Sequence, residues 1–151
     1  MTRIDFYVLK DGSRGNRFGL CCRLVERIYR GTPDGTKPPP RVLIHCPEVQ
    51  QARHLDRLLW SYRDDSFLPH GLVGETDPTL TPILISINDQ PETEDQVLIN
   101  LSSSAEAPPF FSRFERLCEP LDHAPEIRQA GRKRYLYYRD CGYPLAHHQV
   151  G

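Results

Sequence analysis

The stretch RVLIHCPEVQQARHLDRLLW, residues 41–60, joins a strand pattern directly to a helix pattern. Its first six residues, Arg41 to Cys46, form an apolar run with the usual length of one strand. Pro47 and Glu48 suit the first turn of a helix, because the N–H that proline lacks would have no partner there. The apolar residues of this helix recur at helical spacing and would face the core: Ala52, Leu55 and Leu59. The stretch thus predicts a buried strand followed by an amphipathic helix.

A second strand and helix are predicted at the start of the chain. Residues Ile4 to Leu9 read as a strand, with Ile4, Phe6 and Val8 on one face, and a polar, glycine-containing loop follows. Apolar residues then recur at spacings of three and four, which places them on one buried side of a helix that ends near Gly31: Phe18, Cys21, Cys22, Val25, Ile28 and Tyr29.

Short apolar segments predict three more strands, at 66–70, 82–87 and 96–101. One further helix is predicted from Pro108 or Pro109, and another from Pro125 to about Arg139; the first would bury Phe111, Phe114 and Cys118. Continuous apolar strands that alternate with helices are typical of a sheet covered on both faces. We therefore expect an α/β fold with three layers, in which a mostly parallel sheet is flanked by helices, Rossmann-like but without a nucleotide motif.

The length and composition indicate one water-soluble domain, 1–151. The segment GTPDGTKPPP predicts a proline-rich surface loop at about 31–40, and the tail at about 146–151 is expected to fray. No apolar run approaches the roughly 20 residues that cross a bilayer, and the opening residues do not resemble a signal peptide. Five cysteines without a CxxC pair are typical of reduced thiols, so we expect a cytoplasmic protein.

The sequence contains none of the common catalytic signatures. Neither GxGxxG nor GxxxxGK[ST] follows a predicted strand, and GxSxG and HExxH are absent. Cys21 and Cys22 lie on the apolar side of their helix, where burial would make the thiols unreactive. We expect neither an enzyme, nor a cofactor, nor a metal site. A nucleotide-binding α/β hydrolase stays open as an alternative, on fold analogy alone.

The last predicted helix carries a stripe of cations beside an aromatic ring. Arg128, Arg132, Tyr135 and Arg139 fall within an arc of about 60° at 100° per residue. No acidic residue is interleaved on this face, so the arginines would repel one another in the absence of an anion. Arginine holds a carboxylate through two hydrogen bonds, and tyrosine adds a ring and a donor. The stripe predicts a site for an acidic, aromatic peptide.

Nucleic acid phosphate is the competing anion for this stripe. A formal net charge of -1 argues against bulk electrostatic coating of nucleic acid. Three or four cations would give weak binding with a strong salt dependence. A direct binder of single-stranded DNA is therefore kept as a second alternative.

Five segments occur together in an order and spacing that point to one family: RIDFYVL, RVLIH, LDRLLWSYRDDSFLPH, VLINL and GRKRYLYYRDCGYPL. Over nearly its whole length the chain resembles the chi subunits of bacterial DNA polymerase III holoenzyme. The resemblance implies a non-catalytic accessory subunit of the clamp loader, with an α/β fold, that acts in DNA replication. It also implies two partners, the psi subunit and the acidic C-terminal tail of single-stranded-DNA-binding protein, with nucleic acid contacted only indirectly and no membrane. In the family this tail ends in a phenylalanine that follows aspartates.

The resemblance assigns the tail-binding residues. The family uses basic residues and a tyrosine on its last helix, which Arg128, Arg132 and Tyr135 match here. Leu121 matches an apolar wall of the same pocket. Arg139 belongs to the stripe by helical geometry but has no match in the family, so we expect it to be either an auxiliary or a merely solvated charge.

The resemblance places psi on a different surface, near the only tryptophan of the chain. The matching residues are Trp60, Phe67, Leu68 and Pro69. Large aromatic residues are usually found in the core. We accordingly expect Trp60 to be buried, while Phe67 could be buried or exposed.

Overall fold

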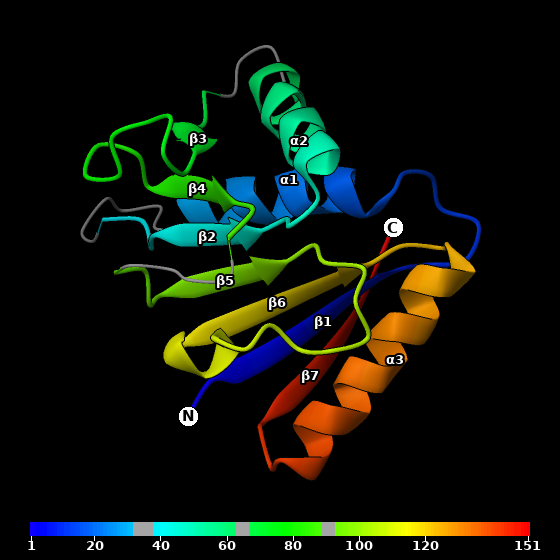
Figure 1. Cartoon of the computed structure of the whole chain (residues 1–151). Coiled ribbons are helices and arrows are strands. Elements are labelled where there is room, and N and C mark those ends of the chain that lie inside the picture. The colour runs from blue at the N-terminus through cyan, green and yellow to red at the C-terminus, as the bar shows by residue number, and fades with distance from the viewer. Residues whose placement is uncertain (32–37, 63–66, 89–92) are drawn as a thin grey trace.

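The computed structural model describes residues 1–31, 38–62, 67–88 and 93–151. Within these ranges the chain forms one seven-stranded sheet in the order β3-β4-β2-β5-β6-β1-β7 (Figure 1). All neighbouring strands are parallel. The strands are β1 (Arg3–Leu9), β2 (Val42–His45), β3 (His70–Leu72), β4 (Ile83–Ser86), β5 (Val97–Asn100), β6 (Arg116–Leu121) and β7 (Leu145–Val150). The predicted α/β fold with a mostly parallel sheet is confirmed.

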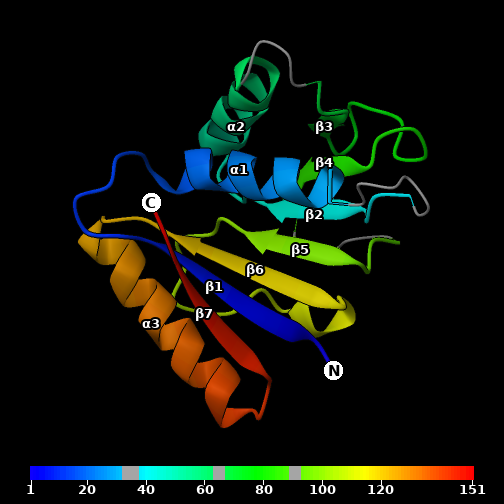
Figure 2. The ribbon, with the colours of Figure 1, turned by 180° about the vertical axis from the view of Figure 1, so that it is seen from behind.

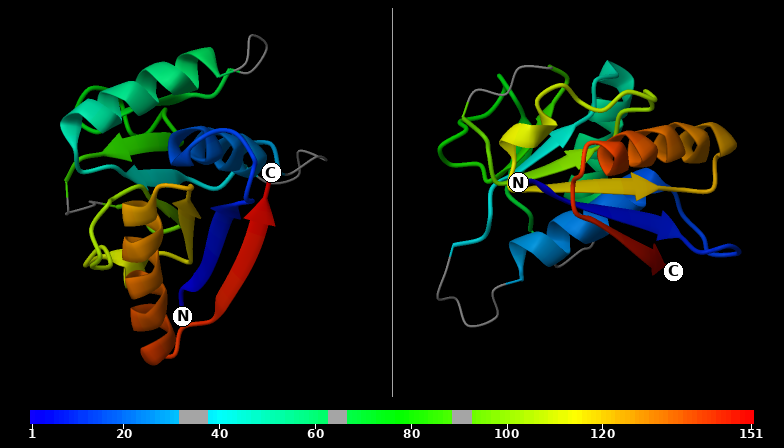
Figure 3. Two further views of the ribbon diagram at one scale, coloured as in Figure 1. Left: turned by 90° about the vertical axis from the view of Figure 1, so that its right-hand side faces the viewer. Right: turned by 90° about the horizontal axis from the view of Figure 1, so that it is seen from below.

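Helices cover both faces of the sheet. The helices of the described residues are α1 (Arg17–Tyr29), α2 (Val49–Ser61), α3 (Pro125–Asp140) and the 3-10 turn η1 (Phe111–Arg113). Side chains of α1 and α2 share one apolar cluster with the sheet, and side chains of η1 and α3 share another. Figure 2 brings α1 to the front, and the right panel of Figure 3 shows α1 and α3 on opposite sides of β1 and β6. The three predicted layers are therefore present.

Local sequence explains where the helices begin. Asn16 caps α1, since its side chain accepts hydrogen bonds from the N–H groups of Phe18 and Gly19. Glu48 caps α2 in the same way through the N–H of Gln50, so this helix begins one residue after the glutamate. Pro125 occupies the first turn of α3. None of the helices in the described ranges is long and apolar enough to cross a membrane.

The prediction of a helix from Pro108 or Pro109 is wrong. Phe111 and Phe114 are buried, but the chain forms only the turn η1 and then enters β6, which contains Cys118. A spacing of three residues fits a single 3-10 turn as well as an α-helix. Pro120 stands inside β6 and would end any helix that reached it. Pairing of β6 with both β1 and β5 therefore overrides the helical reading.

Two other predictions also need correction. The strand expected at 66–70 lies later, because β3 begins at His70 and Phe67 to Pro69 lead into it; Ser66 falls outside the described residues. The tail expected to fray at 146–151 instead forms β7, which pairs with β1 along its length. This pairing satisfies the backbone of the tail and could not be read from its polar sequence. Most of the proline-rich segment, residues 32–37, also lies outside the described residues.

Candidate functional site

Helix α3 turns one side to the sheet and the other to solvent. Ile127, Gly131 and Tyr138 are buried against the sheet. Beneath the helix, Glu119 of β6 pairs with Arg134 at 3.1 Å and accepts a hydrogen bond from the Tyr138 hydroxyl at 2.7 Å. Burial, together with the nearby Glu119, raises the pKa of Tyr138, which keeps its hydroxyl protonated as a donor. This network fixes the register of α3 on β6.

A cavity of about 260 Å³ opens between α3 and strands β1, β6 and β7. Its lining contains four of the five residues predicted for the tail site, and four that the sequence analysis did not assign to it. The predicted residues are Leu121, Arg128, Arg132 and Tyr135; the additional ones are Phe6, Val8, Gly131 and His147. The cavity therefore combines apolar walls with two guanidinium groups at its rim.

The apolar part of the cavity depends on close packing of α3 against the sheet. Phe6 and Tyr135 meet edge to face, with ring centroids 5.2 Å apart. Gly131 lies directly over Leu121, so close that a Cβ at this position would force the leucine to shift. The aromatic pair and Leu121 thus form fixed walls.

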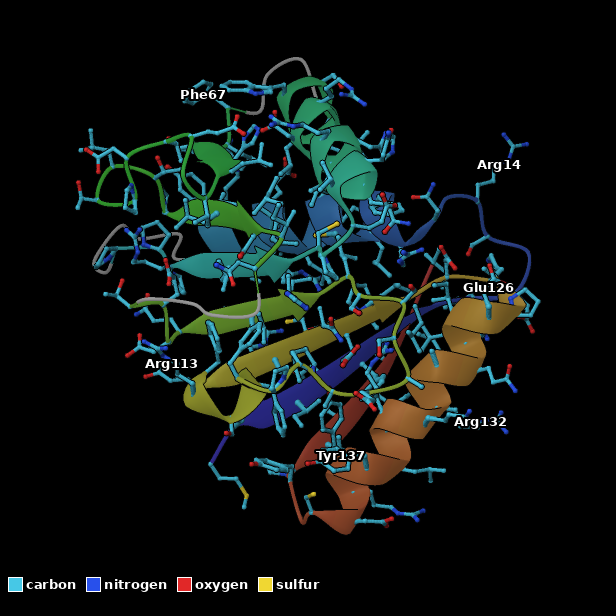
Figure 4. The ribbon with its side chains drawn as sticks, viewed as in Figure 1. Arg14, Phe67, Arg113, Glu126, Arg132 and Tyr137 are labelled. Carbon is cyan, nitrogen blue, oxygen red and sulfur yellow. The ribbon has the colours of Figure 1, made fainter. Side chains whose placement is uncertain are left out.

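The arginines of the stripe differ in their surroundings. Arg128 is half-buried and donates to the backbone oxygens of Asp122 and Leu9, both at 2.8 Å, so its guanidinium is held in place. Within the described ranges, the exposed Arg132 makes no ion pair or side-chain hydrogen bond, and Figure 4 shows it projecting outward from α3. Arg139 lies outside the cavity lining and pairs with Asp140 at 3.1 Å. The expectation that the stripe lacks counter-charges therefore holds for Arg132 but not for Arg139.

The surface predicted to bind psi is only partly exposed. Trp60 is 56% exposed, so the expectation that it belongs to the core is wrong. It follows Leu59 by one residue, which turns it about 100° away from the buried side of α2. Phe67 is 66% exposed and its ring lies 6.0 Å from that of Trp60. Leu68 is buried in the core and Pro69 is half-buried, so the two aromatic rings are what this surface offers.

Four of the five cysteines are core residues. Cys21, Cys22, Cys46 and Cys118 are buried, whereas Cys141 is exposed. Burial raises the pKa of Cys22 and of Cys118 to about 12, so their thiols stay protonated near neutral pH. Among the described residues, no group of three or more histidine, cysteine or acidic side chains is arranged to hold a metal ion.

Comparison with known proteins identifies the family. The model of the family described as DNA polymerase III chi subunit, HolC, matches residues 1–146. The chain belongs to the DNA polymerase III chi subunit family. It is 36% identical to DNA polymerase III subunit chi of Pseudomonas aeruginosa, over 99% of this chain and 98% of that protein. It is also 32% identical to the Escherichia coli chi subunit, over 96% of each. The expected resemblance and the expected role as an accessory subunit of a polymerase are confirmed.

Solved structures with a similar backbone share the fold alone. The T4 UvsW structure superposes with a TM-score of 0.67 at 9% identity, over 99% of this chain and 41% of that one. Domain 2 of the DEAD-box helicase Mss116p gives a TM-score of 0.55 at 11% identity, over 98% of this chain and 64% of that one. At such low identity these matches indicate a common α/β architecture and carry no functional argument.

The sequence contained signals for some of the additional residues that line the α3 cavity. Phe6 and Val8 were placed on one face of the first strand, and α3 packs on that face. His147 gave no such signal, because its place in the pocket requires the pairing of β7 with β1, where it lies beside Phe6. The contact of Gly131 with Leu121 is a tertiary feature that requires the packing of α3 on β6.

Proposed function

We propose that this chi subunit is a non-catalytic clamp-loader subunit that, together with psi, links the loader to single-stranded-DNA-binding protein. It would do so by gripping the acidic C-terminal tail of that protein during replication. The observation that carries the proposal is the cavity on α3, where an apolar pocket opens beneath Arg128 and Arg132. A peptide with aspartates before a terminal phenylalanine has the chemistry that such a cavity complements.

Each part of the cavity has a role in this proposal. Arg132 is unpaired within the described part of the chain and would meet the terminal carboxylate or an aspartate, since a guanidinium binds a carboxylate through two hydrogen bonds. Arg128 is already positioned by backbone oxygens and adds a fixed positive charge. The phenylalanine ring would enter between Tyr135 and Leu121, above Phe6. A short peptide with so few anchors loses ordering entropy on binding, so we expect micromolar affinity.

The psi subunit would dock on the aromatic surface formed by Trp60 and Phe67. Two adjacent exposed aromatic rings support this assignment, because buried aromatic anchors dominate the centres of protein interfaces. The surface lies at the end of α2, away from α3, as the positions of Phe67 and Arg132 in Figure 4 show. Both partners could therefore bind at the same time.

Titration with an acidic peptide that ends in phenylalanine tests the proposal. Arg132→Ala should weaken binding roughly tenfold or more, the loss expected when a charged hydrogen bond worth about 1.5 to 3 kcal/mol is removed. Lys133→Ala is the matched control, because Lys133 is exposed on α3 and absent from the cavity lining. Amidation of the peptide C-terminus should also reduce affinity. Equal affinity of wild type and Arg132→Ala would exclude the proposed tail site.

A further inference from the structure

Helix α1 carries a second arginine row, on the face of the sheet opposite to α3. Arg23, Arg27 and Arg30 follow one another at spacings of four and three residues, within an arc of about 60°. All three are exposed, and in the described part of the chain their guanidinium groups have no hydrogen-bond or ion-pair partner. Figure 2 shows that α1 lies on the outside of the molecule. The row therefore faces solvent.

The row borders two neighbouring cavities. The larger, of about 480 Å³, has an apolar floor that includes Leu24, Ile28 and Val97, and arginines from three elements surround it: Arg3, Arg27 and Arg116. The smaller, of about 270 Å³, shares Leu24 and Arg27 with the first and adds Arg23 and Tyr62. The side of α1 is thus hollowed beside its arginines.

The acidic residues near this groove do not neutralise it. Asp5 is buried and lies 3.2 Å from Arg3 and 3.0 Å from Arg116, so one carboxylate is shared by two guanidinium groups. His148 also contacts it at 3.1 Å. Among the described lining residues, Glu115 is the acidic one of the larger cavity and Glu26 that of the smaller. Counting only residues that the structure describes, five arginines against these three acids leave an excess of positive charge.

We propose that this α1 groove binds the backbone of a single-stranded nucleic acid, with phosphates on the arginines and a base over the apolar floor. The row spans about 10 Å of helix from Arg23 to Arg30. Its repeated guanidinium groups could therefore pair with successive phosphates of a nucleic acid backbone. Arginine suits this role because its planar group both pairs with phosphate and stacks on bases. A duplex keeps its bases stacked inside, so it cannot use the floor. The groove lies across the sheet from the α3 cavity and is independent of it.

Fluorescence polarisation with a labelled thymidine oligonucleotide of about 20 residues measures this binding directly. With four or five phosphates contacted, the logarithm of the association constant should fall with the logarithm of salt at a slope of about -3. Arg27→Glu, placed between both cavities, should weaken binding several-fold and reduce the magnitude of the slope by about 1. Lys133→Glu makes the same charge change on the other face of the sheet and should leave both values unchanged.

Thermal melting of each variant shows whether it remains folded, and Arg27→Ala provides a milder version of the same test. If the wild-type protein did not bind the oligonucleotide at 20 mM salt, the proposal would be overturned. Equal losses of oligonucleotide affinity in Arg27→Glu and Lys133→Glu would overturn it as well. Competition by polyglutamate separates the two classes of polyanion. If polyglutamate displaced the oligonucleotide at equal charge concentration, the groove would be a site for acidic protein and the proposal would be wrong.

Discussion

A Cβ atom on Gly131 would lie 2.6 Å from Cδ1 of Leu121, so α3 rests on β6 with nothing between the helix backbone and that leucine. Real Cβ atoms do not approach other carbon atoms so closely. The contact fixes the depth of the α3 cavity, because Leu121 is one of its walls. Any larger residue at this position would push Leu121 aside, so glycine, although a poor helix former, keeps the present shape of the pocket.

Gly131→Ala should lower peptide affinity with little change in stability. Alanine favours the helix by about 1 kcal/mol over glycine, and the atoms that it would displace are the methyl ends of Leu121, which border an open cavity, so the two effects on stability should nearly cancel. Displacement of Leu121 into the cavity should weaken the acidic peptide at the same time. Urea denaturation and peptide titration measure the two effects. A variant that binds the peptide like wild type would show that Leu121 is not a wall of the binding site.

Asp5 predicts how stability changes with acid. Burial alone would raise its pKa, but hydrogen bonds from His148 and Arg116 and the nearby arginines hold the pKa below the ordinary value of 3.8. The carboxylate therefore stabilises the fold above pH 4, and this contribution disappears as the pH falls through the lowered pKa. Asp5→Asn should be less stable than wild type at pH 7. As the pH falls from 4 to 2, it should lose less stability than wild type loses. Parallel stability curves for the two proteins would contradict this role.

The neighbours Phe67 and Leu68 should separate partner binding from folding. Phe67 is mostly exposed, so Phe67→Ser should leave the melting temperature nearly unchanged and abolish most of the affinity for psi in a pull-down or titration. Leu68 is 2% exposed, and Leu68→Ala should destabilise the fold by about 2 to 5 kcal/mol. Unchanged psi binding in Phe67→Ser would remove the aromatic surface from the interface.

Some strands and helices could be predicted from the sequence and others could not. Strands made of continuous apolar runs, such as β2 and β5, and helices with a clear period, such as α1 and α3, were predictable because burial imposes their patterns. The strand β6 was not, since Phe111 and Phe114 fit two kinds of turn and Pro120 interrupts the strand pattern.

Likewise, only part of the α3 cavity could be predicted from the sequence. The helical period brought Arg128, Arg132 and Tyr135 together correctly, and the family resemblance supplied Leu121. The period also included Arg139, which lies beyond the cavity and pairs with its neighbour Asp140. An i to i+1 ion pair crosses helix faces, so a count of charges on one face could not reveal it.

His147 offers the sharpest test of the α3 cavity, because only the three-dimensional structure brings it there. It lies on β7 beside Phe6 of β1 and lines the cavity with Arg128 and Arg132. His147→Glu places a negative charge among the groups proposed to hold an acidic tail, so affinity should fall at least tenfold, and the loss should shrink at high salt. His147→Gln adds no charge and should change affinity much less. The side chain is exposed on an edge strand, so melting temperatures should stay close to that of wild type. If His147→Glu bound the peptide as tightly as His147→Gln, the tail would not pass over β7, and the pocket proposed for it would have to be placed elsewhere on α3.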